Sequence, residues 1–172
     1  MKRPEPVQVI KQRRDAVLAA LVGQIPYLTY LGVTFDRRGD EITGVLSYHD
    51  DLIGNPILPA LHGGVTAAFL EATAVMTLSW FTLWDDLEAG HIETAEPSAI
   101  KLPRLPKTID VTVDYLRSGL PRDAYARARV TRSGRRYASV HVEAWQDNVA
   151  RPFAQATGHF LMPPKDAPGG DG

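Results

Sequence analysis

The sequence predicts an α+β domain in which one long central helix packs against an antiparallel sheet of about six strands. Three observations support this fold class: an apolar helical segment in mid-chain, alternation of apolar and polar residues after residue 107, and short turn-rich links. The 172 residues suit one domain with one core. We expect a helical extension at 1–26, the domain proper at 27–163 and a flexible tail at 164–172.

The N-terminal part of the chain predicts one helix and two strands. Apolar residues recur at helical spacing from Ile10 to Ile25, and Pro26 ends the pattern, which predicts an amphipathic helix over roughly 7–24. Two strand-like segments follow near 31–36 and 41–48, joined by a turn at 38–40. Two prolines then interrupt residues 54–59.

The central segment over residues 64–81 reads as a helix that is apolar almost all round. Such a helix has no solvent face of its own, so we expect the sheet to wrap it. Residues 85–96 are acidic and show no clear helical or strand periodicity, which predicts an irregular connection.

The C-terminal part predicts four strands. Alternation starts at 107 and continues through 124–131 and 137–145, and a fourth strand runs from Phe153 to Leu161. Because the links are short and rich in turn residues, consecutive strands are expected to pair antiparallel as a meander.

Composition excludes several classes of function. Nineteen basic and twenty acidic residues give a formal net charge of -1, so no overall field attracts nucleic acid. The absence of cysteine excludes disulfide scaffolds and a Cys nucleophile, and favours a cytoplasmic location. No apolar run approaches the roughly 20 residues that span a bilayer. We therefore expect no membrane association. The five histidines lack metal-site spacing, so we also expect no metal.

One carboxylate in the central helix lies off its polar side. At about 100° per residue, Thr66, Thr73 and Thr77 form a narrow stripe, and Glu71 lies about 120–140° away among small apolar residues. Apolar surroundings disfavour the ionised form and raise basicity, which is the setting of a catalytic base or nucleophile. The alternative is a structural ion pair with an arginine, or an acid that reaches solvent near the helix end.

The residues His62-Gly63-Gly64 stand directly before this helix. The glycines let the backbone approach another group closely, and the first free N–H groups of a helix carry a partial positive charge. Such a site can hold a carbonyl oxygen as it becomes an oxyanion. We expect His62 to hold the loop rather than to act as a general base. No G-x-S-x-G motif is present, so an α/β-hydrolase is excluded.

Together these residues resemble a known family, the hotdog-fold acyl-CoA thioesterases, in particular the PaaI-like group of the 4-hydroxybenzoyl-CoA thioesterase superfamily. In that group His-Gly-Gly opens the central helix and an acid lies nine positions after the His, as Glu71 lies after His62. Residues 110–117 also resemble the strand that follows the helix. The order of elements agrees over roughly 27–162, and the motif reads Gly54-Asn55-Pro56, Leu61-His62-Gly63-Gly64-Val65, Glu71.

The resemblance implies a sheet wrapped round the helix and two active sites at a dimer interface. Gly63 would supply the N–H that polarises the thioester carbonyl, and Glu71 of the opposing subunit would act as nucleophile or general base. Thr108 would position the water. Asn55 would hold substrate or water, although it lies seven residues before His62, where six is the commoner spacing.

The resemblance further implies an acyl-CoA substrate, self-association as a homodimer or homotetramer, and no cofactor. The thiolate of coenzyme A leaves readily, so hydrolysis requires no strong acid at the leaving group. His62 and Gly64 would border the substrate. Arg132, Arg135 and Arg136 at a tight turn either bind the phosphates of coenzyme A or lie on a solvated face. Trp80, Phe81 and Trp84 either line an acyl pocket or belong to the core.

Two other functions remain open from the sequence. One is a hotdog dehydratase for hydroxyacyl thioesters, although the spacing of His49 and Glu71 matches that class poorly. The other is a module that binds acyl-CoA without turnover. Release of free thiol separates hydrolysis from both.

Overall fold

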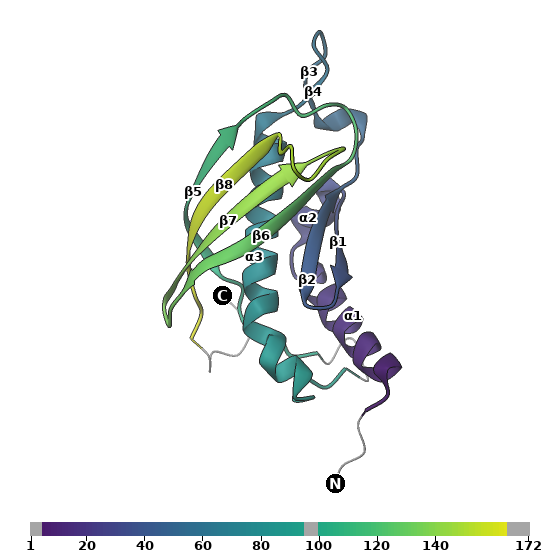
Figure 1. The fold of residues 1–172 in the computed structure, drawn as a ribbon, viewed down its shortest axis with the longest axis vertical. Coiled ribbons are helices and arrows are strands. Elements are labelled where there is room, and N and C mark those ends of the chain that lie inside the picture. The colour runs from purple at the N-terminus through teal and green to yellow at the C-terminus, as the bar shows by residue number, and fades with distance from the viewer. Residues whose placement is uncertain (1–4, 95–99, 165–172) are drawn as a thin grey trace.

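The computed structural model describes residues 5–94 and 100–164. It confirms the predicted fold class: a six-stranded antiparallel sheet curves around one long helix, and an N-terminal helix packs beside them (Figure 1). This is the hotdog arrangement. The predicted tail lies outside the described residues, except for Pro164.

The N-terminal elements are α1 (Val7–Gly23), α2 (Pro26–Leu31), β1 (Val33–Arg38) and β2 (Glu41–Leu46). The predicted helix and both strands are present, but the short helix α2 was not predicted. Its signals are local, because Pro26 occupies the first turn and Gly32 ends the helix in the left-handed region at φ 72°.

The central helix α3 spans Gly63–Glu88, 26 residues, and is longer than predicted. The expectation of an irregular connection from residue 85 is therefore wrong for 85–88. Leu83 and Leu87 are buried, and α1 packs against α3, so the apolar face continues beneath the acidic residues. Residues 95 and 96 of the predicted connection lie outside the described part of the chain.

By length and composition, α3 could cross a membrane, since one 18-residue window has a mean hydropathy of 1.3. This corrects the expectation that no apolar run is long enough. Half of that window is buried inside the domain, as is usual for a core helix. The length of α3 is therefore accounted for by the sheet around it.

The remaining elements are η1 (Asp50–Leu52), β3 (Ile53–Asn55), β4 (Ala60–Leu61), β5 (Lys107–Tyr115), β6 (Ala124–Ser133), β7 (Tyr137–Trp145) and β8 (Ala154–Leu161). The main sheet has the order β1-β2-β6-β7-β8-β5, and β3 and β4 form a separate hairpin.

The predicted meander is right for β6–β7–β8 and wrong for β5, which pairs with β8 instead of β6. The cause lies at the end of β5. The N–H groups of Leu116 and Arg117 both donate to the carbonyl of Phe153, just before β8. The chain therefore leaves β5 beside β8, and residues 116–123 carry it across to β6.

Small residues let the sheet lie close to α3. Six alanines on β6, β7 and β8 are fully or almost fully buried: Ala124, Ala126, Ala138, Ala144, Ala154 and Ala156. On β2, a Cβ at Gly44 would stand 2.8 Å from the Thr73 hydroxyl. Phe69 and Phe160 fill the space that the small residues leave.

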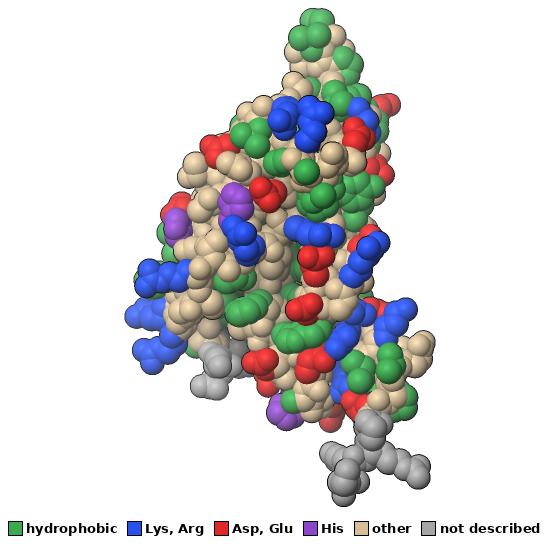
Figure 2. Space-filling view, viewed as in Figure 1, with side chains coloured by type: hydrophobic (Ala, Val, Ile, Leu, Met, Phe, Trp, Pro, Cys, Tyr) green, Lys and Arg blue, Asp and Glu red, His purple; other side chains and the backbone are tan. Residues whose placement is uncertain are grey.

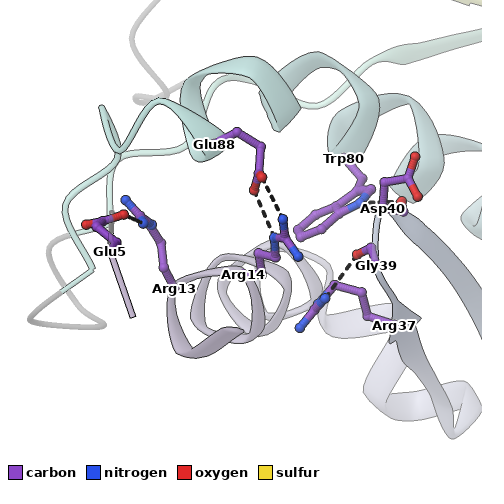
Figure 3. A network of polar contacts seen from close by, with 8 residues as sticks. All are labelled: Glu5, Arg13, Arg14, Arg37, Gly39, Asp40, Trp80 and Glu88. Atoms are coloured by element: carbon purple, nitrogen blue, oxygen red, sulfur yellow. Dashed lines mark hydrogen bonds and ion pairs between the residues drawn. The ribbon is translucent and has the colours of Figure 1, made fainter. Parts of the chain in front are cut away.

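Polar contacts join α1 to the C-terminal half of α3 (Figure 3). The Arg14 guanidinium donates to both carboxylate oxygens of Glu88, at 2.8 and 2.6 Å, and lies 4.8 Å from the centre of the Trp84 ring. Arg13 pairs with Glu5. On the other side of α1, Arg37 of β1 pairs with Asp15 at 2.5 Å.

The Arg14–Glu88 pair is expected to contribute a pH-dependent share of stability. The hydrogen bond from Arg14 holds the pKa of Glu88 below its ordinary value of 4.5. A lowered carboxyl pKa stabilises the fold above the unfolded-state pKa, and the effect is lost as the pH falls through the folded-state value. A double-mutant cycle with Arg14→Gln and Glu88→Gln should give a coupling free energy of about 0.5–1 kcal/mol at pH 7, because both side chains are partly exposed.

Urea unfolding at pH 7 and pH 3 measures this coupling, which should be smaller at pH 3. Lys11→Gln, an exposed change on the same helix, is the control and should change the free energy of unfolding little. Equal coupling at both pH values would contradict the role of the Glu88 charge.

Candidate active site

Glu71 is half-buried on α3 and faces the start of β5. The Thr108 hydroxyl donates to Glu71 Oε1 at 2.6 Å. In the described residues Glu71 has no arginine or lysine partner, so the structural ion pair considered as the alternative is contradicted there. The contact leaves Glu71 Oε2 available to a second hydrogen-bonding group.

A β-bulge places Thr108 on the same side of the sheet as Glu71. Thr108 pairs with the buried Phe160, but the register shifts between Thr108 and Asp110, so that Ile109 is the extra residue. Strict alternation would put Ile109 on the helix-facing side and Thr108 outside. With the bulge, Thr108 faces α3 and Ile109 is 53% exposed.

The start of α3 is held by several hydrogen bonds. His62 is the N-cap, and its Nδ1 accepts the N–H of Gly64 at 2.9 Å, which agrees with the expected loop-holding role. The N–H of His62 donates to Leu52 at 2.8 Å, and the N–H of Leu61 donates to Gly119 at 2.8 Å. In the described part of the chain the Gly63 N–H has no hydrogen-bond partner, as expected of a first helical residue.

Tyr115 adds a contact that the sequence reasoning missed. Its hydroxyl donates to the Gly63 carbonyl at 2.8 Å and so fixes the peptide that follows Gly63. A Cβ at Gly63 would stand 3.4 Å from the Tyr115 hydroxyl oxygen. The available signal was the alternation in β5, which puts Tyr115 on the same side as Val111 and Val113.

Asn55 lies at the end of β3, in the hairpin that projects beyond the sheet in Figure 1. Its side-chain oxygen accepts the N–H groups of Ile57 and Leu58, at 3.0 and 3.3 Å. Within one chain the structure does not bring Asn55 to Glu71. Its substrate role stays a prediction.

The two groups expected to act on one carbonyl are far apart within a chain. Gly63 and Glu71 are separated by eight residues of helix, which is about 12 Å along the axis. A single thioester carbonyl cannot contact both. Within one chain, therefore, Glu71 and the Gly63 N–H do not meet at one carbonyl.

A cavity of about 1480 Å³ lies between the C-terminal half of α3 and the far end of the sheet. It is lined by Trp80, Phe81 and Trp84 from α3, together with Ala128 and Val130 from β6. Trp80 is 3% exposed, and its indole N–H donates to the Asp40 carbonyl at 2.8 Å. Trp80 thus belongs to the core and also borders the cavity, Trp84 is partly buried against the core, and Phe81 is 56% exposed.

The three predicted phosphate-binding arginines are exposed around the β6–β7 turn. In Figure 2, basic side chains gather at the lower left, where this hairpin ends. Arg135 and Arg136 border the cavity. Within the described residues, none of these arginines has an ion-pair partner. They are Arg132, Arg135 and Arg136. Within the same ranges no three His, Asp or Glu side chains gather as metal ligands.

The family model described as "Acyl-CoA thioesterase N-terminal domain" matches residues 54–161 of this chain. The chain belongs to this acyl-CoA thioesterase family. The match begins at the β3–β4 hairpin and ends with β8, so it includes His62, Gly63, Glu71 and Thr108. The helix α1 precedes the matched range.

Two relatives of similar length are the medium/long-chain acyl-CoA thioesterases YigI of Salmonella typhimurium and Escherichia coli K12. Each is 27% identical to the chain, over 158 and 157 residues, and the match covers 91% of this chain and 97% of each relative. A solved protein from Chromobacterium violaceum is 30% identical, with a TM-score of 0.59 and coverage of 91% and 97%. A Bacillus halodurans protein crystallised with CoA shares the fold at 17% identity and a TM-score of 0.58, with coverage of 93% and 95%.

Proposed function

We propose that this thioesterase-family chain hydrolyses medium- or long-chain acyl-CoA to a free fatty acid and coenzyme A. The observation that carries the proposal is the hydrogen bond from Thr108 of β5 to Glu71 of α3. The same helix begins at Gly63, whose N–H has no partner in the described residues. The chain-length class comes from the YigI relatives, which cover almost the whole chain.

In this proposal Glu71 takes a proton from a water molecule that Thr108 orients. The water oxygen attacks the thioester carbonyl carbon, and the negative charge that develops on the carbonyl oxygen meets the Gly63 N–H of a second copy. The C–S bond then breaks, and coenzyme A leaves as a thiolate that takes up the proton which Glu71 removed from the water. The other route is direct attack by the Glu71 carboxylate, followed by hydrolysis of the resulting anhydride.

A homodimer supplies the second copy. Strand β5 is a sheet edge, and seven of its nine residues are exposed, including Ile109 and Tyr115. A long exposed edge offers its free N–H and C=O groups to another strand. An antiparallel partner there would lie beside Glu71 and can bring its own helix start within reach. A catalytically active monomer in light scattering at assay concentration would contradict this arrangement.

The direct test is the release of free thiol from acyl-CoA esters of 4 to 16 carbons. Hydrolysis predicts stoichiometric thiol and fatty acid. An enoyl thioester formed from a hydroxyacyl-CoA without thiol would instead favour the dehydratase. The dehydratase would need a histidine beside the catalytic acid. His49 instead lies 3.7 Å from Asp51 and makes no ion pair with Glu71 in the described residues. Tight binding without turnover would favour a ligand-binding module.

Thr108→Val is expected to lower kcat about tenfold, because the substitution keeps the shape of the side chain but removes the hydroxyl that contacts Glu71. Thr108→Ser should restore most of the activity. Thr112→Val is the matched control, since Thr112 is exposed on the same strand and pairs with Thr157 away from Glu71. The same loss in both valine variants would assign the effect to the strand rather than to the hydroxyl.

Two finer assignments stay predictions. The nine-residue spacing from His62 to Glu71 supports the PaaI-like group. The exposed, unpaired positions of Arg132, Arg135 and Arg136 support contacts with the coenzyme A phosphates. If these contacts exist, an arginine-to-alanine variant loses one of them, and its KM for acyl-CoA should rise. Its KM for acyl-pantetheine, which lacks the nucleotide phosphates, should not change.

A further inference from the structure

We propose that Tyr115 positions the Gly63 N–H for the reaction by holding the peptide group that follows Gly63. This inference rests on the proposed function and adds a residue to the site without placing it against the reacting atoms. Tyr115 is the last residue of β5, and its hydroxyl donates to the Gly63 carbonyl oxygen at 2.8 Å. It is therefore a positioning residue and not a catalytic one.

Both peptide groups that flank Gly63 are held by hydrogen bonds. The peptide before Gly63, which carries its N–H, accepts the Thr66 N–H through the His62 carbonyl at 3.1 Å. The peptide after Gly63 accepts the Tyr115 hydroxyl. Because glycine has more backbone freedom than any other residue, the direction of the Gly63 N–H depends on both contacts. Removal of the Tyr115 hydroxyl loosens one of them.

The sheet fixes the backbone of Tyr115, although the residue is 55% exposed. Tyr115 pairs with the fully buried Ala154 of β8. The next two N–H groups, those of Leu116 and Arg117, both donate to the Phe153 carbonyl. The position of the hydroxyl therefore depends only on rotation of the Tyr115 side chain itself.

The Tyr115 ring also covers the side of Gly63 on which a side chain would lie. A Cβ at Gly63 would stand 3.4, 3.5 and 3.6 Å from the hydroxyl oxygen, Cζ and Cε1 of Tyr115. The ring therefore excludes water from this side of the peptide. A hydrogen-bond donor stabilises a developing charge most strongly when it is fixed in advance and shielded from water.

Strand β5 holds both groups that the proposed mechanism uses. Thr108 at its start donates to Glu71, and Tyr115 at its end donates to Gly63. Figure 1 shows β5 running beside α3 toward the end of the molecule where the helix begins. The oxyanion that the Gly63 N–H meets is absent from the bound substrate. Loss of the Tyr115 hydroxyl should therefore lower kcat and leave KM little changed.

The experiment compares Tyr115→Phe with Tyr137→Phe in the full-length protein. Phenylalanine keeps the ring and removes only the hydroxyl. Tyr115→Phe should lower kcat for dodecanoyl-CoA about fivefold to tenfold, as expected for one lost hydrogen bond, and leave KM within about twofold. Tyr137 on β7 is 57% exposed, and its side chain makes no hydrogen bond in the described residues. Tyr137→Phe should therefore change neither constant, and an unchanged kcat in Tyr115→Phe would overturn the proposal.

A double variant shows whether Tyr115 acts through Gly63. Gly63→Pro deletes the N–H but keeps the carbonyl that Tyr115 contacts. In that background Tyr115→Phe should have no further effect on kcat. The same loss in both backgrounds would overturn the proposal, because Tyr115 would then act independently of the Gly63 N–H. A raised KM with unchanged kcat would also overturn it and assign the hydroxyl to substrate binding.

Amide NMR of protein labelled with [15N]glycine tests the positioning without turnover. Tyr115→Phe should shift the Gly63 and Gly64 signals, and Tyr137→Phe should not. The aromatic ring is retained, so a shift reports the lost hydrogen bond. Gly63→Ala identifies the Gly63 signal by removing it, and the other glycine signals show that the fold is retained.

If the protein releases no thiol from any acyl-CoA, the proposed function fails and the spectrum decides alone. A shifted Gly63 signal in Tyr115→Phe then supports the role of Tyr115 in directing this N–H. An unshifted signal overturns it.

Discussion

Glu71→Gln is expected to lower kcat for dodecanoyl-CoA by about 10²–10⁴-fold, the range typical of losing a general base. Glutamine keeps the length of the side chain, and its amide oxygen can still accept the Thr108 hydroxyl. The variant therefore removes the charge and basicity of Glu71 while preserving its position. Measurement of initial rates of thiol release tests this directly.

The control for this substitution lies on the same helix. Asp86→Asn changes an exposed carboxylate of α3 whose partner is His91 at 3.3 Å, away from Thr108. It should leave kcat within twofold of the unchanged protein. An active Glu71→Gln variant would remove the side chain from the chemistry, and with it the central step of the proposed mechanism.

Gly63→Pro should cost about 10²–10³-fold in kcat, the loss seen when one oxyanion donor is removed. Proline deletes the N–H but suits this position, because Gly63 is the first residue of α3. The preceding His62 already has φ -60° and ψ 135°, the extended geometry that a residue before proline prefers. The helix is therefore expected to survive the change.

Gly63→Ala is the matched control, since it adds a Cβ and keeps the N–H. That Cβ would stand 3.4 Å from the Tyr115 hydroxyl oxygen, an ordinary contact, so activity should fall only slightly. Thermal unfolding of both variants checks that α3 is intact. Equal activity in the two variants would show that the Gly63 N–H does not stabilise the transition state.

The sequence predicted the parts of the site that depend on local pattern. His62, Gly63 and Glu71 lie on one helix and its cap, so their relation follows from helix geometry once the helix is recognised. The expected role of His62 as a loop-holding residue agrees with its bond to the Gly64 N–H. The fold class could also be predicted from the sequence, because helical spacing before residue 26 and alternation of apolar and polar residues after residue 107 are both clear in this chain.

Contacts between distant segments could not be read in the same way. Strict alternation in β5 groups Ile109 with Val111, whereas the bulge turns Ile109 out and Thr108 in. No local signal marks that extra residue, because it depends on the register with β8. The exchange of partners by β5 likewise depends on the hydrogen bonds at Phe153, more than thirty residues away in sequence.

The position where α3 ends also could not be predicted from its own sequence. Residues 85–88 look irregular because their acidic side chains hide the helical period, yet Leu83 and Leu87 are buried and Glu88 meets Arg14 of α1. The helix is thus extended by a partner element. A window confined to α3 does not contain that information.

The attachment of α1 has a consequence for the wall of the cavity. Arg14 lies over Trp84, which lines the cavity, although α1 precedes the range shared with the family. One wall of the cavity is therefore held by a helix that contacts the C-terminal half of α3 and not the helix start or Glu71. Loss of the Arg14 contact is therefore expected to loosen the Trp84 wall, while the hydrogen bonds at the helix start and at Glu71 stay in place.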